Sequence, residues 1–355
     1  MEIFPQKRGI GQETAMKKWL GRCVTLMALW AQCAFAADEA LVAAAKKEGA
    51  VTWYTTQIVT QFARPAAEAF QKKYGIKVDF VRGDSVEIAL RVTNEAKAGR
   101  VLADVFDSTS GLAALKRENL IEPWLPESAR RLPEAFWDKN AYWVATNVFI
   151  HQPSFNTNLV PRGSEPKTYE DLLDPKWKGK MSWAGHATPS GAPGFVGVIL
   201  HAMGQDKGLA YLRQLAKQDI TPLSISSRAA VDQVIAGEYS IVLQALNHQP
   251  VISARLGAPV DWMPMSPALG ILSVASLIKN SPHPNAGKLL IDYFISEEGQ
   301  KLFRDGDYIT VDPNIPPREA SLSPSGGKFS AFYLTPEELD ESLRKWTQTF
   351  RDIFR

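Results

Sequence analysis

A strand, a loop and a helix follow one another three times between residues 50 and 118. Short apolar runs rich in β-branched and aromatic residues predict strands at 50–55, 76–81 and 103–106. Helical periodicity predicts helices at 62–73, 86–98 and 111–118. The repeat of roughly 25 residues fits one right-handed crossover each time. The pattern therefore predicts an α/β fold with a mainly parallel sheet.

The loops that follow these three strands carry hydroxyl groups and other short polar side chains. The carboxyl ends of parallel strands share one edge, where open α/β sheets bind ligands. Ser, Thr and Asp are also good helix caps, so capping explains any single loop equally well. Three such loops along one edge favour a ligand site. The candidate residues are Thr56, Gln57, Ser85, Ser108 and Thr109.

A second candidate site lies in the stretch 181–200, where a short apolar run and a Gly- and Pro-rich segment precede an apolar, helix-length run. Ser190, Gly191 and Ala192 stand where the loop becomes a helix N-terminus. Free backbone N–H groups and the positive end of the helix dipole suit a small anion at such a place. Pro193 at the first helical position also fits an ordinary capped helix start. The local sequence leaves both interpretations open.

Two more pairs of polar residues follow along the chain. Ser227 and Arg228 open a predicted helix at 229–236, where a guanidinium could clamp a carboxylate or phosphate. A surface charge is an equally good interpretation of Arg228. Asn247 and His248 lie in a predicted polar turn after a strand at 239–245, as ligand contacts or as simple turn residues.

The remaining pattern completes two lobes. Strands at 143–150 and 272–277 are predicted to cross between them, and 261–265 is a further strand. His151 and His283 stand beside prolines in predicted turns. Further helices are predicted at 39–47, 206–217, 285–295, 296–303 and 336–354.

The composition excludes several classes of protein. The chain has 355 residues, of which 45% are hydrophobic and 22% charged, which is ordinary for a globular chain with two lobes. A formal net charge of +2 argues against a nucleic-acid partner. The sequence has no P-loop, no complete nucleophile elbow, and no two histidines three or four residues apart. We expect no enzyme, no catalytic residue, no cofactor and no resident metal, and an exported hydrolase is a remote alternative.

The N-terminal segment has the three parts of a secretory signal peptide. A positive segment, 16–22, precedes an apolar run at 23–35, and small residues stand at the cleavage position. We expect cleavage after Ala36, with Ala37 as the alternative, and Met16 is an alternative start. The apolar run is too short to span a bilayer comfortably. Both cysteines lie in the segment that would be removed, so the mature chain would have no disulfide and no thiolate site.

Several segments in combination are characteristic: the start 39–49, the strand with Trp53-Tyr54, the segment 169–180 (YEDLLDPKWKGK), and the segments 237–242 and 294–303. Together they resemble the family 1 extracellular solute-binding proteins, the periplasmic receptors of ABC importers. The likeness covers essentially the whole mature chain and is nearest to the ferric-iron-binding branch.

The resemblance implies a periplasmic binding protein type II fold, in which two α/β lobes joined by two crossing strands close on a ligand in the cleft between them. The implied division is 1–36 for the signal peptide, 37–145 with 271–355 for the first lobe, and 146–270 for the second. It also implies that Ser190, Gly191 and Ala192 form the anion-holding loop of the family. The implied partners are a small-molecule ligand and an inner-membrane ABC permease, for a monomer in the periplasm.

One departure from the iron-binding branch bears on the ligand. Its members carry two adjacent tyrosines where Asn247 and His248 stand here, and this sequence contains no Tyr-Tyr pair. Phenolate oxygens suit ferric iron, whereas amide and imidazole groups suit an oxyanion. We therefore predict a small anionic or zwitterionic solute that bears a phosphonate, phosphate ester or carboxylate group. Ferric iron held with a synergistic anion is the alternative.

Overall fold

The structure is a computed structural model that describes residues 39–354. The predicted signal peptide, its cleavage site, the alternative start and both cysteines lie outside these residues. From Leu41 onward the chain forms one compact unit. Among the described residues, no helix is long and apolar enough to cross a membrane.

The first three strands are parallel, as the repeated strand–loop–helix pattern predicts, with β1 paired to both β2 and β3. The predicted helices follow them, although the first begins with a π-helical turn. Gly75 ends that helix in the left-handed conformation. The elements are β1 (Ala50–Thr55), η1 (Val59–Ala63), α3 (Arg64–Tyr74), β2 (Lys77–Arg82), α4 (Ser85–Lys97), β3 (Val105–Ser108) and α5 (Leu112–Arg117), after α2 (Glu39–Glu48).

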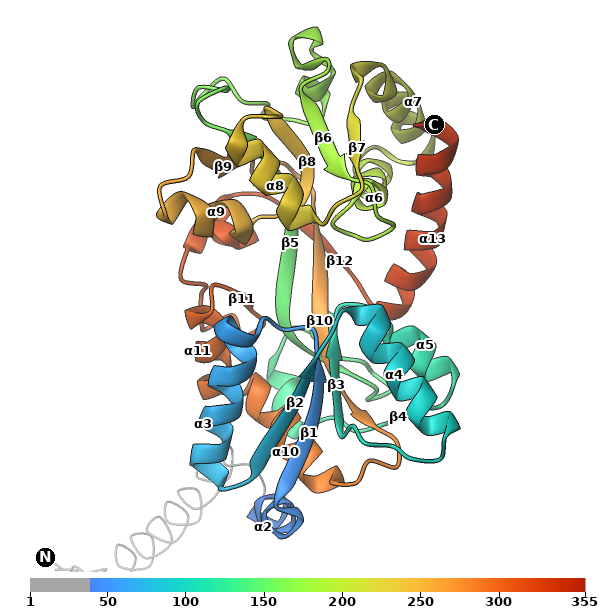
Figure 1. Ribbon diagram of the computed structural model, residues 1–355, viewed down its shortest axis with the longest axis vertical. Coiled ribbons are helices and arrows are strands. Elements are labelled where there is room, and N and C mark those ends of the chain that lie inside the picture. Colours follow the sequence, from blue (N-terminus) through green and yellow to red (C-terminus); the bar gives the residue numbers. More distant parts are fainter. Residues whose placement is uncertain (1–38, 355) are drawn as a thin grey trace, which may run out of the picture. The chain divides into compact units, whose positions relative to one another are not determined.

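Two long buried strands, β5 (Val144–Asn156) and β10 (Ala268–Ile278), pair antiparallel in the middle of one continuous sheet. The strand order is β2-β1-β3-β10-β5-β8-β6-β7, so β5 and β10 join the strands of one lobe to those of the other. Figure 1 shows them running through the centre between the two groups of strands. The predicted pair of crossing strands is confirmed.

The strand β5 is longer than the sequence predicts, and the predicted turn at His151 is wrong. The strand continues through Pro153 to Asn156. Pro153 has no N–H, and the register against β8 shifts between Gln152 and Ser154, which is the bulge that a proline within a strand requires. His283 is likewise not in a free turn but stands at the N-cap of α10 (Pro284–Ile295).

In the second lobe β8 pairs antiparallel with β5, and β6 and β7 follow it in parallel. Gly237 ends α8 in the left-handed conformation. The predicted polar turn at 247–250 is wrong, because these residues begin a helix, α9. Pro250 falls in its first turn, where a backbone N–H has no partner to lose. The elements are β6 (Met181–Ala184), α6 (Ala192–Met203), α7 (Gln205–Leu215), β7 (Thr221–Leu223), α8 (Ser227–Ala236), β8 (Ile241–Leu246), α9 (His248–Arg255) and β9 (Val260–Trp262).

The last part of the chain returns to β10 and then to α6. The strand β12 pairs parallel with β10. The remaining elements are α11 (Glu297–Asp305), β11 (Ile309–Thr310), α12 (Pro324–Gly327), β12 (Ala331–Leu334), α13 (Pro336–Ile353), β4 (Ile121–Glu122), and the 3₁₀ turns η2 (Glu127–Arg131), η3 (Glu134–Phe136), η4 (Glu170–Leu173), η5 (Pro175–Trp177), η6 (Ala216–Gln218) and η7 (Ala320–Leu322).

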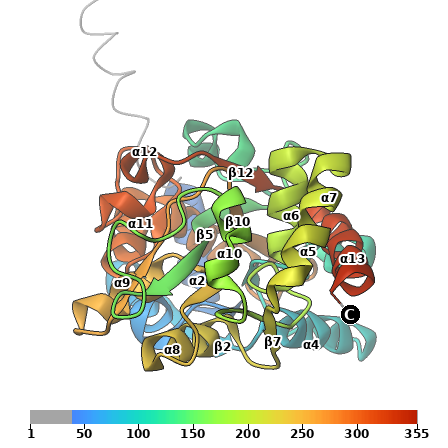
Figure 2. The ribbon, with the colours of Figure 1, turned by 90° about the horizontal axis from the view of Figure 1, so that it is seen from above.

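The helix α13 packs on α6. Leu339 and Trp346 are buried in one core with Phe195 and Val196. Figure 2 shows α6, α7 and α13 lying together. A Cβ at Gly197 would meet the Trp346 ring at 2.4 Å, so this glycine lets the indole lie directly on the α6 backbone.

The predicted division of the chain into lobes stays a prediction.

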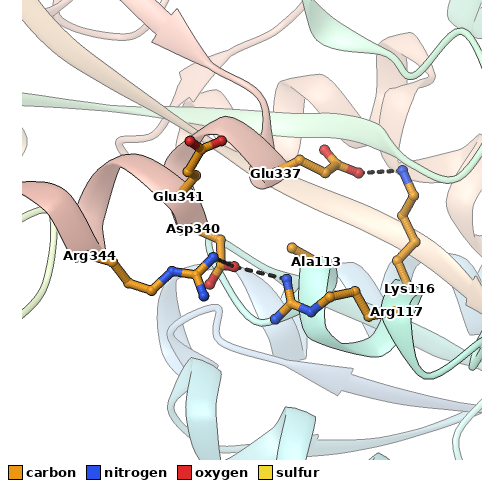
Figure 3. A pocket seen from close by; sticks show the side chains of 7 residues that line it. All are labelled: Ala113, Lys116, Arg117, Glu337, Asp340, Glu341 and Arg344. Carbon is orange, nitrogen blue, oxygen red and sulfur yellow. Dashed lines mark hydrogen bonds and ion pairs between the residues drawn. The ribbon is translucent and has the colours of Figure 1, made fainter.

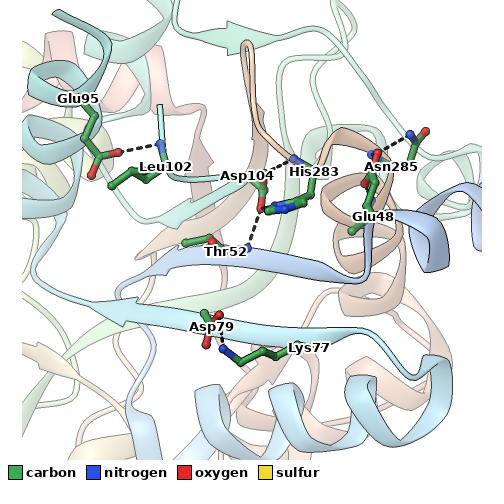
Figure 4. A network of polar contacts seen from close by, with 10 residues as sticks. Glu48, Thr52, Lys77, Asp79, Glu95, Leu102, Asp104, His283 and Asn285 are labelled. Atoms are coloured by element: carbon green, nitrogen blue, oxygen red, sulfur yellow. Dashed lines mark hydrogen bonds and ion pairs between the residues drawn. The ribbon is translucent and has the colours of Figure 1, made fainter. Parts of the chain in front are cut away.

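A network of polar contacts joins the start of α10 to α2, to β1 and to Asp104, the residue before β3 (Figure 4). The Asp104 carboxylate accepts hydrogen bonds from the N–H of Thr52 and of His283, both at 2.7 Å. Glu48 accepts from the N–H of Asn285 and Ala286, at the positive end of α10. Glu48 thus satisfies two helix N–H groups that would otherwise lack partners, and Asp104 ties the N-cap residue of the helix to β1.

The contact of Gly197 with Trp346 can be tested by a double-mutant cycle. We expect Gly197→Ala alone to lower the free energy of unfolding by about 1–3 kcal/mol, because the added methyl overpacks the site. In a Trp346→Leu background the same change should cost close to nothing, since the indole is gone. Urea denaturation of the four proteins gives the coupling. Equal costs in both backgrounds would show that the indole does not rest on Gly197.

Candidate ligand-binding site

The loop before α6 folds back over the first turn of the helix. A Cβ at Gly191 would lie 2.4 Å from the His186 carbonyl oxygen, and one at Gly194 would lie 1.8 Å from that of Pro189. Only glycine allows so close an approach. Gln244 of β8 donates from Nε2 to the Pro189 oxygen at 3.0 Å. The loop is thus held in one shape by two glycines and one side-chain amide.

This loop leaves two backbone donors at the start of α6. The Gly191 N–H donates to the Thr188 carbonyl, and Gly191 makes no side-chain cap. Within residues 39–354, no acceptor pairs with the N–H of Ser190 or of Ala192. Both lie at the positive end of a helix of 12 residues. The predicted anion-holding residues therefore stand together at a helix N-terminus with N–H groups available.

The hydroxyl of Ser190 has a partner that the sequence did not indicate. His151 Nε2 lies 3.0 Å from Ser190 Oγ, and His151 Nδ1 lies 3.2 Å from the Leu269 carbonyl oxygen. The imidazole is only 3% exposed. Burial lowers the pKa of His151 to about 4, so the ring is neutral near pH 7. The local sequence does not indicate this role of His151, because Pro153 nearby is a turn signal.

A second group of candidates stands where α8 and α9 begin. Ser226 rather than Ser227 caps α8, and among residues 39–354 the buried hydroxyl of Ser227 has no hydrogen-bond partner. Asn247 is fully buried and donates from Nδ2 to the Leu322 carbonyl at 2.9 Å, while its Oδ1 has no partner in the part of the chain that the structure describes. A buried polar atom without a protein partner calls for another one, which a water, an ion or a ligand can supply.

Arg228 bridges the two helix starts. Its Nη2 lies 2.7 Å from Asp232 Oδ1, and its Nη1 donates to the Gln249 carbonyl at 3.3 Å. The side chain is 45% exposed, so this ion pair contributes little to stability. The guanidinium thus keeps donors that are free to meet an anion beside α9.

His248 is the first residue of α9 and is buried. Burial lowers its pKa to about 4, with Asp307 acting to raise it and Arg228 to lower it. Its ring lies against Phe149 and Tyr308. Like His151, His248 is therefore a neutral imidazole near pH 7 and adds no positive charge to the site.

Three hydroxyl groups of the first lobe meet at the ends of β2 and β3. Ser108 Oγ donates to Ser85 Oγ at 2.7 Å, and Ser85 Oγ lies 3.4 Å from Thr109 Oγ1. Asp84, not Ser85, caps α4. Thr56 is half-buried, and its N–H donates to the Asp107 carbonyl. The structure brings Ser85, Ser108 and Thr109 together, as the shared sheet edge predicts.

Gln57 takes part in a buried network beneath this edge. Its Nε2 lies 2.8 Å from Asn147 Oδ1 on β5 and 3.2 Å from Ser273 Oγ on β10. Asp107 accepts from Thr55 Oγ1 at 2.8 Å and from Ser273 Oγ at 2.9 Å. Burial raises the pKa of Asp107 to about 6. The Nε2 of Gln57 is thus committed to the crossing strands, whereas its buried Oε1 has no partner among the described residues.

The candidate residues of the first lobe and those of the second lie beside different parts of β10. Ser108 lies opposite Val274, and His151 lies opposite Leu269. Among the described residues, no hydrogen bond joins the hydroxyl groups of the first lobe to the anion loop, Arg228 or Asn247 of the second. The candidate site therefore consists of two half-sites on either side of the middle of the crossing strands.

Two charged pockets lie elsewhere. One, of about 430 Å³, lies between α5 and α13, where Lys116 pairs with Glu337 and Arg117 with Asp340 (Figure 3). The other is lined by residues between Gly163 and Trp177. None of the predicted ligand residues lines either pocket. Within residues 39–354, no group of three or more His, Cys, Asp or Glu residues is placed to hold a metal ion.

Two α/β lobes joined by two crossing strands, with helix starts presented at the join, define a binding protein of the periplasmic type II class. Residues 65–325 match the family model for bacterial extracellular solute-binding proteins. That match spans well over half of the chain, which therefore belongs to this family. The predicted class of protein is confirmed.

Similar proteins agree with this assignment. A Salmonella typhimurium protein named "Putative 2-aminoethylphosphonate-binding periplasmic protein" is 26% identical over 264 residues, 71% of this chain and 72% of that protein. Iron-bound HitA from Pseudomonas aeruginosa matches with a TM-score of 0.67 at 22% identity, covering 86% of this chain and 99% of its own. AfuA from Actinobacillus pleuropneumoniae, with bound fructose-6-phosphate, matches with a TM-score of 0.67 at 19% identity, covering 86% and 98%. The two structures confirm the predicted fold class, and the Salmonella protein is by its name a periplasmic binding protein.

The buried carboxyl of Asp107 predicts a pH dependence of stability. Its pKa is raised from 3.8 to about 6 on folding, so the folded state binds the proton more tightly than the unfolded chain. This contribution is complete below pH 4 and is lost as the pH rises through 6. Wild type therefore loses this contribution between pH 4 and pH 7, and Asp107→Asn does not. The unfolding free energy of Asp107→Asn minus that of wild type should rise by on the order of 2–3 kcal/mol over this range. Urea denaturation at both pH values measures it, and a difference that does not change with pH would contradict it.

Proposed function

We propose that this protein is the periplasmic receptor of an ABC importer and that its ligand is a small phosphonate or phosphate ester. The observation that carries this proposal is the anion loop, Ser190, Gly191 and Ala192, with two unpaired N–H groups at the positive end of α6. Tetrahedral oxyanions are bound in this way at helix starts. The protein binds its ligand without turnover and acts as a monomer.

The charges around the anion loop support a single anionic head group. Arg228 is the one cationic side chain among the predicted ligand residues, and His151 and His248 are neutral near pH 7. A carboxylate would also meet Arg228, but the N–H groups and hydroxyl at 190–192 suit a group with three oxygens. The phosphorus oxyanions in the names of the Salmonella protein and the AfuA complex support the same choice.

The opposite half-site suits an amino or hydroxyl group on the ligand. Ser85, Ser108 and Thr109 present hydroxyl oxygens there, and in the second lobe Asn247 Oδ1 is a further acceptor with no partner among the described residues. An ammonium group requires only acceptors. A zwitterion such as 2-aminoethylphosphonate would therefore bring its two ends to the two half-sites when the lobes close by rotation at the crossing strands.

Location and partner follow from the same assignment. The predicted signal peptide and the periplasmic relatives support export to the periplasm, with an inner-membrane permease that accepts the closed, loaded form.

Ferric iron with a synergistic anion is the second candidate, because iron-bound HitA shares the fold. Against it stand Asn247 and His248 at the positions of the tyrosine pair. A loaded iron protein would be coloured, whereas a phosphonate complex would not.

A ligand screen with two variants tests the proposal. Wild type should show thermal stabilisation by 2-aminoethylphosphonate or a sugar phosphate without turnover, following RT ln(1 + [L]/Kd). Ser190→Ala with Arg228→Ala should weaken binding by about 10- to 100-fold in calorimetry, because one charged and one neutral hydrogen bond are lost. Arg213→Ala on α7 is the matched control and should bind as wild type does. Unchanged affinity in the double variant would refute the site, and stabilisation by ferric citrate alone would refute the ligand class.

The shape of the anion loop can be tested at Gly191. Gly191→Ala places a methyl 2.4 Å from the His186 carbonyl, so the loop must shift and its N–H groups must turn away. We expect a loss of about 100-fold or more in affinity with an unchanged circular dichroism spectrum. Gly185→Ala in the same loop is the control, since the nearest atom to its Cβ lies 3.3 Å away. Wild-type affinity in Gly191→Ala would place the ligand elsewhere.

A further inference from the structure

His151 links three parts of the molecule that are distant in sequence. It stands on β5, its Nδ1 faces the Leu269 carbonyl of β10, and its Nε2 faces Ser190 Oγ of the anion loop. The separations in sequence are 118 and 39 residues. His151 is only 3% exposed, so its ring nitrogens depend on protein partners, among which the Phe149 backbone also acts on the ring.

The partners determine which nitrogen carries the proton. A carbonyl oxygen can only accept, so the Nδ1 of a neutral ring carries the hydrogen that is donated to Leu269. The Nε2 atom is then a lone-pair acceptor, and Ser190 must donate its hydroxyl hydrogen to it. The proton of Ser190 is thereby committed to the protein, and its oxygen presents only lone pairs to a ligand.

The charge state of His151 is stable over the pH range in which such ligands titrate. Its pKa of about 4 results from burial, with a further lowering by the charge of His248 on α9. Around His248 stand Arg228 of α8 and Asp307 before β11, which act on it in opposite directions. Leu269 and Ser190, which contact the two ring nitrogens of His151, have no side chain that titrates in this range. His151 itself therefore does not change its charge between pH 5.5 and 8.5.

The anion loop therefore offers two donors and one acceptor side by side. The donors are the N–H groups of Ser190 and Ala192, and the acceptor is Ser190 Oγ. A fully ionised oxyanion places a lone pair against this acceptor, or it forces the hydroxyl to turn away and leaves the buried Nε2 without a partner. Either loss corresponds to about 10- to 100-fold in affinity. An oxyanion that still carries one proton pairs with all three groups.

We propose that His151 is a positioning residue that makes Ser190 a hydrogen-bond acceptor, so that the site selects singly protonated phosphonates or phosphates over fully ionised anions such as sulfate. This inference rests on the proposed function and narrows its ligand class. Carboxylates carry no proton at neutral pH, so the site disfavours them for the same reason as sulfate.

The test is calorimetry with 2-aminoethylphosphonate, methylphosphonate and sulfate from pH 5.5 to 8.5. In wild type the affinity for both phosphonates should fall about tenfold per pH unit above the second pKa of the ligand, and sulfate should bind at least tenfold more weakly at pH 6. Asp107 titrates near pH 6, so the series is repeated with Asp107→Asn, which should keep the slope.

His151→Phe removes the acceptor and frees the Ser190 hydroxyl to donate. The pH slope of the affinity should then flatten, and the affinity for sulfate relative to that for the phosphonates should rise about tenfold. If His151→Phe does not fold, Ser190→Ala and Ser190→Thr decide, because both lie on the loop. The alanine variant should lose the slope, and the threonine variant, which keeps a hydroxyl, should retain it. A merely structural role of His151 would change affinity without changing the slope.

The outcomes separate the two proposals. If wild type binds a phosphonate with no pH slope, or binds sulfate equally well, the inference is overturned and the proposed function stands. If the slope persists in His151→Phe, His151 does not cause it and the inference is likewise overturned. If wild type binds none of the phosphorus oxyanions, the proposed function itself fails. The ¹⁵N shifts of His151 are an independent measurement, and an Nε2–H tautomer would overturn the inference directly.

Discussion

The antiparallel pairing of β5 with β10 is the contact on which the rest of the structure depends. These buried strands carry one continuous sheet from the first lobe to the second. In their middle Asn147 lies opposite Ser273, and Gln57 of the first lobe bonds to both. Further along, His151 bonds to Leu269 and to the loop of the second lobe. Because buried polar groups must find partners, each lobe is tied to the crossing strands by its own hydrogen bonds.

The candidate site uses dipoles and neutral groups rather than many charges. Burying full charges costs more than burying N–H groups that already point outward from a helix start. His151 and His248 are kept neutral by burial, and Arg228 remains partly in solvent. The unpaired atoms at Ser227 and Asn247 cost stability while they lack a partner. A ligand that pairs with them would recover that cost, which favours binding over simple packing.

Local sequence pattern was sufficient for most elements and failed where proline was involved. The strands and helices between residues 50 and 118, and the helix after Gly191, follow from periodicity and caps that act within a few residues. Pro153 and Pro250 were misleading because proline is a strong turn signal. It is tolerated within a strand at a bulge and in the first turn of a helix. Whether a proline has such a place depends on the neighbouring strand or turn, which the local sequence does not display.

By itself the sequence determined the α/β class, the membership in the solute-binding family, and the loop of Ser190, Gly191 and Ala192 at a helix start. Only the tertiary structure decided which side chains share hydrogen bonds: the Ser190 hydroxyl with His151, Gln57 with the crossing strands, and Trp346 of α13 with Gly197. The reason is physical. Periodicity, caps and turns act over a few residues, whereas these contacts join residues 39 to 216 positions apart and depend on the order of strands in the sheet. The neutral state of His151 depends on burial by the same distant segments, so it too became visible only in three dimensions.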